Sequence, residues 1–357
     1  MKKLLLLLLC VPFIGLGQNV NIPDANFKSY LVGDPSINTN GDVEIQLSEA
    51  TSFNGQIQCS GMTISDLTGI EAFTALSILI CNNNQLTTLD VSNNTALHTL
   101  RCFGNQLTSL DVSGCTALTE LFCNNNQLTS FNLNGATALN WLECNDNQLT
   151  SLNINSPYLD IFDCSNNLIT SLNIYGWPDL TMYDCSNNQL TSLDLSNITS
   201  IHKLDCKNNQ LTSLDVQHLD IAELWCQDNK ITALDLSGTS YLSALMCKDN
   251  QLTTLDIRNM GNDPVNMVFN SLNNPNLTCI NIDSNWIYTA TLGFWQRDTQ
   301  HYFSNNCPPP SSIEEQTSNK ELLKITDILG RETKEKKNTP LFYIYDDGTV
   351  EKKLIIE

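Results

Sequence analysis

The fold of this chain is set by a short stretch that recurs with small changes: Leu118-Thr119-Glu120-Leu121-Phe122-Cys123-Asn124-Asn125-Asn126-Gln127-Leu128. Within it, Leu121 and Cys123 alternate with Glu120, Phe122 and Asn124, which is the period-two pattern of a strand with one buried face. Each copy therefore predicts one short strand, followed by a turn and a further buried apolar position.

Nine cysteines keep the repeat in register. They are separated by 21, 21, 21, 20, 21, 21, 20 and 21 residues, and an asparagine stands three residues after each. A fixed period of this length is typical of stacked repeats, in which each unit buries its apolar face against the next. The cysteines are Cys81, Cys102, Cys123, Cys144, Cys164, Cys185, Cys206, Cys226 and Cys247.

The frame L-x-x-L-x-C-x-x-N-x-L resembles the leucine-rich repeat family from about Cys59 to Asn273. The resemblance implies a mostly β solenoid with parallel strands and with extended or 3₁₀ segments on its convex side, since about 21 residues leave little room for a helix. Its cysteines stand where the family places aliphatic residues, so we expect small buried hydrophobes. We expect the asparagines to turn inward and satisfy backbone groups of neighbouring turns.

Both ends of the array need caps, because the end turns would otherwise expose their apolar faces. We expect an N-terminal cap at 18–58 that includes a short helix around Ile22–Leu31, the array at 59–273 and a C-terminal cap at 274–307. In the last turn, Asn270 and Asn273 are assigned to the cysteine and asparagine places. A disulfide between Cys279 and Cys307 is predicted to close the C-terminal cap.

Two segments indicate export to a secreted or cell-surface location. Two lysines followed by a short apolar run predict a signal peptide at 1–17. Beyond a linker at 308–319, residues 320–357 predict a small β module with an Asp-Gly hairpin turn. Its pattern D-I-L-G-R … Y-I-Y-D-D-G-T-V is similar to the sorting domain of type IX secretion substrates of the Bacteroidetes, although the first strand of that domain is missing. A β module with no sorting role is the alternative.

Composition excludes several functions. The chain has 18 Lys+Arg against 38 Asp+Glu, a net charge of −20, which disfavours nucleic acid as a partner. Beyond the leader the sequence has no run of 18 apolar residues, so no transmembrane segment is predicted. Four histidines stand in no nucleophile–base spacing, and phosphate-loop and zinc motifs are absent. The sequence therefore predicts a protein that is not an enzyme.

Residues next to the repeat cysteines are expected to point outward from the sheet. Those that precede four consecutive cysteines are acidic, and large aromatic residues stand around them. Aromatic anchors beside charges are typical of protein interfaces. We predict a face that binds an extracellular protein, with a carbohydrate-binding adhesin as the alternative, and with acids that steer a basic partner or hold a cation. The predicted partner-binding residues are Phe103, Phe122, Trp141, Glu143, Asp163, Asp184, Asp205 and Trp225.

A second, weaker cation candidate lies in the N-terminal cap. Oxygen-bearing side chains stand there at the offsets of an EF-hand loop. Val43 takes the place of the glycine that such a loop requires, so the prediction is a capping loop tied by its own hydrogen bonds, and calcium is the alternative. No other cofactor is expected. The candidate ligands are Asn38, Asn40, Asp42, Glu44 and Glu49.

Overall fold

The computed structural model describes residues 18–173, 177, 179–259, 267–290, 295–308, 322–327, 330–334, 340–345 and 350–354. The chain divides into two units, Met1–Cys307 and Pro308–Glu357. The predicted signal peptide, nearly all of the predicted linker and the Asp-Gly turn lie outside the described residues. Among the described residues, no helix is both long enough and apolar enough to cross a bilayer.

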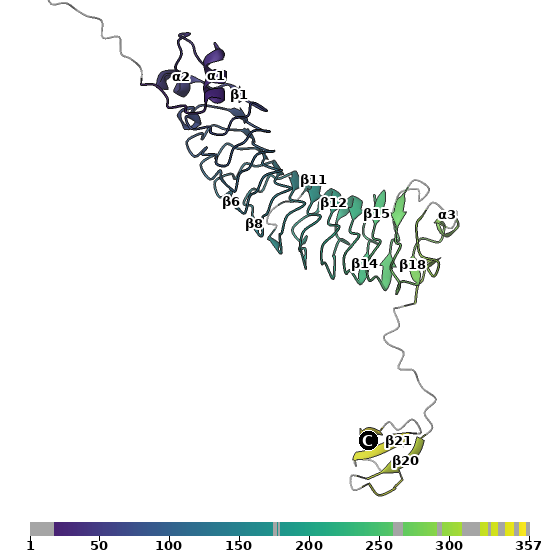
Figure 1. Cartoon of the computed structure of the whole chain (residues 1–357). Coiled ribbons are helices and arrows are strands. Elements are labelled where there is room, and N and C mark those ends of the chain that lie inside the picture. Colours follow the sequence, from purple (N-terminus) through teal and green to yellow (C-terminus); the bar gives the residue numbers. More distant parts are fainter. Residues whose placement is uncertain are drawn as a thin grey trace, which may run out of the picture. The chain divides into compact units, whose positions relative to one another are not determined.

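The first unit is a row of stacked turns built on one long parallel sheet (Figure 1). Each turn supplies one strand to this sheet, and the strands of successive turns pair in parallel, because the chain crosses through the other side of the row between them. The predicted parallel solenoid is therefore confirmed. In spatial order the strands are β1 (Gln56–Gln58), β2 (Ile78–Ile80), β3 (Thr99–Arg101), β5 (Glu120–Phe122), β7 (Trp141–Glu143), β9 (Ile161–Asp163), β11 (Asp179–Asp184), β12 (Ser200–Asp205), β13 (Asp220–Trp225), β15 (Ala244–Met246) and β17 (Val268–Asn270).

The other side of the row also carries strands, as Figure 1 shows for β6, β8, β14 and β18; those described there are two or three residues long. A 3₁₀ turn, η1 (Ile70–Ala72), lies near the N-terminal end. Extended segments with a 3₁₀ turn thus form this side of the described turns, as predicted. The strands are β4 (Ser109–Asp111), β6 (Ser130–Asn132), β8 (Leu152–Asn153), β10 (Leu172–Asn173), β14 (Ala233–Asp235), β16 (Thr254–Asp256), β18 (Cys279–Asn281) and β19 (Tyr302–Ser304), in sheets of two, two and four strands.

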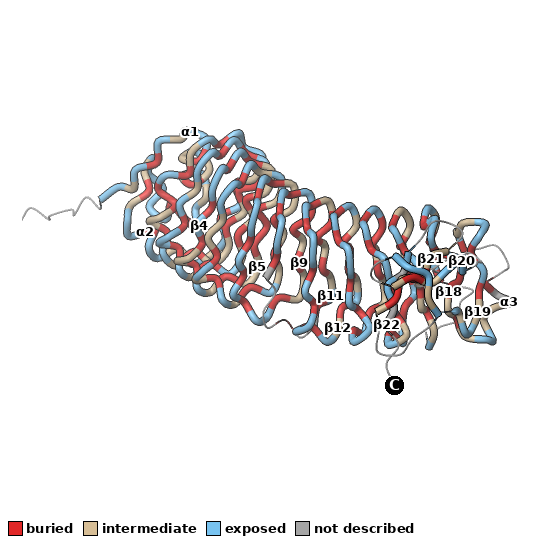
Figure 2. Tube along the Cα trace, turned by 90° about the horizontal axis from the view of Figure 1, so that it is seen from below, coloured by how far each residue is buried: buried red, intermediate tan, exposed pale blue. Residues whose placement is uncertain are grey.

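Leucine and cysteine columns fill the interior between the two sides. Leu121 and Cys123 are fully buried, and buried positions recur in every turn along the tube (Figure 2). In the described part of the chain, eleven cysteines are free and buried. Burial raises the pKa of their thiols, that of Cys102 to about 12. The cysteines therefore serve as small core hydrophobes, as expected.

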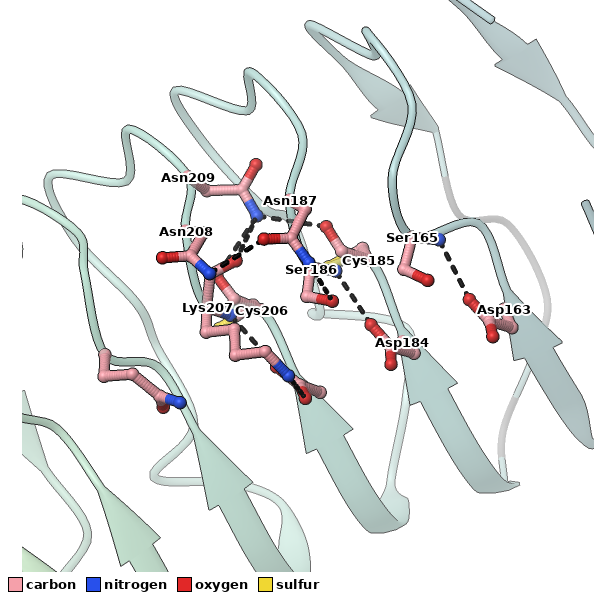
Figure 3. Close-up of polar contacts among 12 residues, drawn as sticks. Asp163, Ser165, Asp184, Cys185, Ser186, Asn187, Cys206, Lys207, Asn208 and Asn209 are labelled. Carbon is pink, nitrogen blue, oxygen red and sulfur yellow. Dashed lines mark hydrogen bonds and ion pairs between the residues drawn. The ribbon is translucent and has the colours of Figure 1, made fainter. Parts of the chain in front are cut away.

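The asparagine column joins each turn to the one before it. In Asn188, Nδ2 donates to the carbonyls of Cys164 (3.0 Å) and Cys185 (3.1 Å), and Oδ1 accepts from the amide of Ile169 (3.0 Å). Figure 3 shows the equivalent bond from Asn209 to Cys185. The predicted inward orientation is confirmed, because this one side chain satisfies backbone groups that no strand pairing reaches.

The assignment of the last turn was wrong by one residue. Ser271 occupies the cysteine place, and Asn274 donates to the carbonyls of Cys247 (3.1 Å) and Ser271 (3.0 Å). Ser271 follows Cys247 by 24 residues, whereas the earlier turns have 20 or 21. The insertion therefore shifts the register away from Asn270 and Asn273.

The residue two positions after each repeat cysteine has a left-handed backbone. Its φ is 53° at Asn125, Asn166 and Asn208 and 65° at Gly104. Asparagine, aspartate and glycine tolerate this conformation best, which explains why these residues recur there. This tight turn ends each strand at the same level and aligns the side chains of neighbouring strands.

The caps close the two ends of the first unit. Helix α1 (Ala25–Gly33) begins after Asp24, whose carboxylate accepts the amides of Asn26 (2.9 Å) and Phe27 (3.0 Å). Helix α2 (Leu47–Ser52) follows it, and α3 (Ile287–Ala290) lies in the C-terminal cap. Cys279 and Cys307 form a disulfide with a Cα–Cα distance of 5.7 Å.

The second unit contains a small antiparallel sheet. Its strands β20 (Leu322–Thr326), β21 (Pro340–Tyr345) and β22 (Val350–Leu354) pair in this order. The predicted C-terminal β module is therefore present.

Candidate partner-binding face

The outward side of the long sheet, here called the sheet face, presents three residues from each turn. They stand three before, one before and one after the repeat cysteine, and the residue between the first two is buried in the core. Strand pairing holds these residues in register, so that Glu143 lies beside Asp163, Asp163 beside Asp184, and Asp184 beside Asp205. These four residues form what we call the acid row, with neighbours one strand spacing of about 4.8 Å apart.

The two middle carboxylates of the acid row, Asp163 and Asp184, are the ones whose negative charge is least neutralised. Oδ1 of Asp163 accepts the amide of Ser165 (2.9 Å), and Oδ1 of Asp184 accepts that of Ser186 (2.9 Å) (Figure 3). Among the described residues, neither carboxylate has an ion-pair partner. Burial raises the pKa of Asp163 to about 6, with a further contribution from Asp184 and Glu143.

Asp205 differs from the other members of the row. Its side chain was predicted to be exposed but is buried, since Lys207 covers it and places Nζ 2.6 Å from Oδ2. Burial raises the pKa of Asp205, while the hydrogen bonds from Lys207 oppose that rise. Asp205 is thus neutralised within the chain and is not free for direct contact with a partner.

At the N-terminal end of the row stands an aromatic pair. The rings of Phe122 and Trp141 lie 5.2 Å apart, and the guanidinium of Arg101 lies 4.8 Å from the Phe122 ring on the preceding strand. Phe122 is therefore only 8% exposed, so its predicted exposure was wrong. Trp141 remains partly exposed, and its indole nitrogen donates to Glu143 Oε1 (3.0 Å). This bond fixes a flat aromatic surface beside the acids.

Trp225 stands at the other end of the row. The ammonium groups of Lys203 and Lys207 lie 4.9 Å and 5.4 Å from its ring, within the range of a cation–π contact. The indole nitrogen is buried and has no hydrogen-bond partner among the described residues. The last predicted contact residue, Phe103, is partly exposed, directly after β3.

Several buried polar atoms on this face lack a partner within the chain. In the described part of the chain, six buried side-chain atoms lack a hydrogen bond, and four of them belong to sheet-face residues: Arg101 Nε, Asn124 Oδ1, Trp225 Nε1 and Gln227 Oε1. Sequence reasoning missed Arg101, Asn124 and Gln227. Their positions beside the repeat cysteines were the available signal, but their burial depends on neighbouring side chains.

Two of the candidate calcium ligands in the N-terminal cap are engaged in contacts within the chain. Glu49 Oε1 accepts the amide of Thr39 (2.8 Å), and Oε2 accepts that of Gln46 (2.9 Å). Glu44 forms an ion pair with Lys28 (2.7 Å). No cluster of three or more His, Cys, Asp or Glu side chains suited to a metal ion occurs in the described ranges. The loop therefore has the form of a cap held by its own hydrogen bonds.

A hollow of about 510 Å³ lies away from the sheet face, among the segments that carry η1 and β4. Its acids are engaged locally: Asp66 accepts the amide of Thr68 (2.8 Å), and Asp111 accepts that of Ser113 (2.9 Å). These hydrogen bonds belong to the turns of the repeat. The acids of the hollow therefore have a structural role in those turns.

Comparison with known proteins agrees with this architecture. The family described as "Leucine Rich repeats (2 copies)" matches residues 95–135. A 74-residue segment is 40% identical to Internalin J of Listeria monocytogenes serotype 4b (strain F2365), and it spans 20% of this chain and 8% of Internalin J. The match therefore covers a small part of that protein.

Solved structures extend the likeness over most of the chain. The functional domain of InlJ from Listeria monocytogenes, described as including a cysteine ladder, is similar with a TM-score of 0.61 and 28% identity, over 81% of this chain and 72% of that one. The leucine-rich repeat domain of APL1B shares the fold at a TM-score of 0.50 and 19% identity, over 70% and 81%. With its nine in-register cysteines and stacked parallel strands, the chain has the leucine-rich repeat fold and is similar to internalins.

Proposed function

We propose that the chain is a non-enzymatic binding module that holds a protein partner on the sheet face. One observation carries the proposal: partly exposed tryptophans and uncompensated carboxylates lie together on this face. A few residues supply most of the binding energy in protein interfaces and are often Trp, Tyr or Arg, and charges around them guide association. Trp141 and Trp225 serve as anchors, Phe103 adds apolar surface, and Asp163 and Asp184 meet polar groups of the partner.

In this proposal, two of the predicted contact residues are buried and hold the anchors in place without touching the partner. Phe122 supports the ring of Trp141, and Asp205 holds Lys207 beside Trp225. Packing of this kind pre-organises the anchors, so that less conformational freedom is lost when the partner binds. Substitution of Phe122 or Asp205 should therefore weaken binding indirectly.

We further propose that the protein acts outside the cell or at its surface. The charged and apolar start of the sequence and the sorting-like tail support this location, as does the disulfide of the C-terminal cap, because disulfides persist in oxidising compartments. If the tail is a sorting signal, the type IX secretion machinery is a further partner.

A carbohydrate ligand is the second candidate. It is favoured by the flat ring of Trp141, held beside Glu143 by a hydrogen bond of 3.0 Å, since sugars stack on such rings and bind carboxylates. A glycan without charge would bind with little dependence on salt, whereas a steered protein contact weakens as salt rises.

The test exposes the immobilised full chain to extracellular protein extracts and to a glycan array. Trp141→Ala/Trp225→Ala is compared with Tyr158→Ala/Tyr241→Ala, which removes two exposed rings (68% and 60%) outside the sheet face. We expect proteins captured by the native chain and by the tyrosine variant to be lost from the tryptophan variant. Equal capture by all three would refute the proposal. Glycans lost only from the tryptophan variant would establish the carbohydrate alternative.

A further inference from the structure

We propose that the partner's contacting segment is cationic: it lays lysine or arginine side chains on Asp163 and Asp184 and apolar side chains on the rings of Trp141 and Trp225. This inference rests on the proposed function and adds the chemistry of the partner. It follows from the charge, the hydrogen-bonding capacity and the length of the acid row.

Charge is the first argument. Asp163 and Asp184 are register partners on β9 and β11, each has one amide bond, and neither has an ion pair among the described residues. Like charges on adjacent strands repel, more strongly where burial keeps water away. Since the whole chain carries a net charge of −20, it attracts a positive partner from a distance as well.

The second, independent argument is the kind of hydrogen bond that the face still needs. Among the described residues, four buried atoms of the face have no partner: the acceptors Asn124 Oδ1 and Gln227 Oε1, on the turns that flank the acid row, and the donors Arg101 Nε and Trp225 Nε1 at the ends of the face. Buried polar atoms in folded proteins nearly always have a partner. The carboxylates of the row and the two amide oxygens accept hydrogen bonds, which the N–H groups of lysine and arginine supply, while the two donors at the ends of the face take oxygen acceptors of the same partner.

The geometry favours a peptide over a metal ion or a neutral sugar. Glu143 accepts a hydrogen bond from Trp141, and Asp205 forms an ion pair with Lys207, so two adjacent carboxylates of the row remain. A cation such as calcium takes six to eight oxygen ligands, more than these two carboxylates supply. Sugar hydroxyls both donate and accept, so they match a row of acceptors less well than a cationic segment does.

The cations already on the face limit the length of the segment. Arg101 stands before the row, and Lys203 and Lys207 stand at its far end. The row itself spans three strand spacings, or about 14 Å. This length accommodates about four extended residues, so two or three consecutive cationic residues with apolar neighbours fit between the positive ends.

The test uses the peptide Gly-Leu-Lys-Arg-Lys-Leu-Gly-amide, labelled with fluorescein at its N-terminus, and an identically labelled control in which glutamine replaces the three cations. Binding to the full chain is measured by fluorescence anisotropy at pH 7.5, in 50 and 300 mM NaCl. Asp163→Asn/Asp184→Asn is compared with Asp194→Asn/Asp215→Asn, an equal charge change at exposed positions outside the face. Melting curves establish that both variants fold.

We expect the native chain to bind the cationic peptide and not the glutamine peptide, with affinity falling at the higher salt. The face variant should bind at least tenfold more weakly, because two charge-assisted hydrogen bonds are lost, while the control variant should change less than twofold. Equal loss in both variants, or equal binding of both peptides, would overturn the inference. So would displacement of the peptide by 1 mM CaCl₂ but not by NaCl of equal ionic strength.

The two proposals can fail separately. If a protein partner depends on Trp141 and Trp225 but the cationic peptide does not bind, the sheet face is still a protein-binding site and only the partner's chemistry is wrong. If the peptide binds through Asp163 and Asp184 but no protein or glycan depends on the tryptophans, the anchor assignment is wrong.

Discussion

Asp163→Asn should make the fold more stable at neutral and alkaline pH while it weakens binding. Asp163 is partly buried between two acidic neighbours and has no ion pair among the described residues, so its charge opposes folding. Asparagine has nearly the same shape and keeps an oxygen that can accept the amide of Ser165. The substitution therefore removes the charge and leaves the hydrogen bond.

The magnitude follows from the raised pKa. Asp163 has a pKa of about 6 in the folded chain, against an ordinary value of 3.8. At 1.36 kcal/mol per pH unit, this difference corresponds to at most about 3 kcal/mol. Because the folded state holds the proton more tightly than the unfolded state, the native chain loses stability as the pH rises from about 4 to 6, and the whole loss is present above pH 6. We expect Asp163→Asn to gain about 1–3 kcal/mol at pH 8 and almost nothing at pH 4.

Urea unfolding followed by circular dichroism at pH 4 and pH 8 measures this difference. Asp194→Asn is the matched control: Asp194 is exposed, and its pKa is lowered by the amide and hydroxyl of Ser196. Its charge stabilises the fold above the ordinary pKa, and that stabilisation is lost as the pH falls, so the control should lose stability at pH 8. A loss at pH 8 in Asp163→Asn, or an equal effect at both pH values, would refute the reasoning.

Further predictions concern the core and the caps. Asn188→Ala should cost about 1–3 kcal/mol in urea unfolding, since it leaves the amide of Ile169 without a partner and removes one of the two asparagine bonds to each of the carbonyls of Cys164 and Cys185, whereas Asn134→Ala at an exposed position should change little. The eleven free cysteines should react with iodoacetamide only on unfolding, because all are buried; rapid labelling of the native chain would contradict this. Calcium at 5 mM should leave the calorimetric melting temperature unchanged, because Glu49 is held by amides of the cap; a rise would reveal a site.

Much of the fold could be predicted from the sequence because the repeat is dense and regular. The cysteine spacing defined the strands, and alternation placed Leu121 and Cys123 inside. The inward asparagines followed from the need to satisfy buried backbone groups. The last turn was misplaced by one residue because nothing in the local pattern marks where an insertion of a few residues enters a loop.

The candidate face was less predictable than the fold. Strand alternation gives the direction of each side chain but not what covers it. Phe122 and Asp205 point outward as expected, yet Arg101 and Trp141 cover the first and Lys207 covers the second. Such coverage depends on rotamers of long side chains from neighbouring turns, which the spacing of a single sequence does not contain.

The measurement that tests the central claim most directly is photo-crosslinking from the sheet face. The amino acid p-benzoylphenylalanine is placed at Met182, a partly exposed position in the middle of the face, or at Tyr241, a 60% exposed position outside it. Each full-length chain is irradiated with extracellular proteins. We expect a protein to be crosslinked from Met182, not from Tyr241, and to be lost when Trp141 and Trp225 are replaced by alanine. Crosslinking from Tyr241 alone, or crosslinking from Met182 that persists without the two tryptophans, would contradict the account.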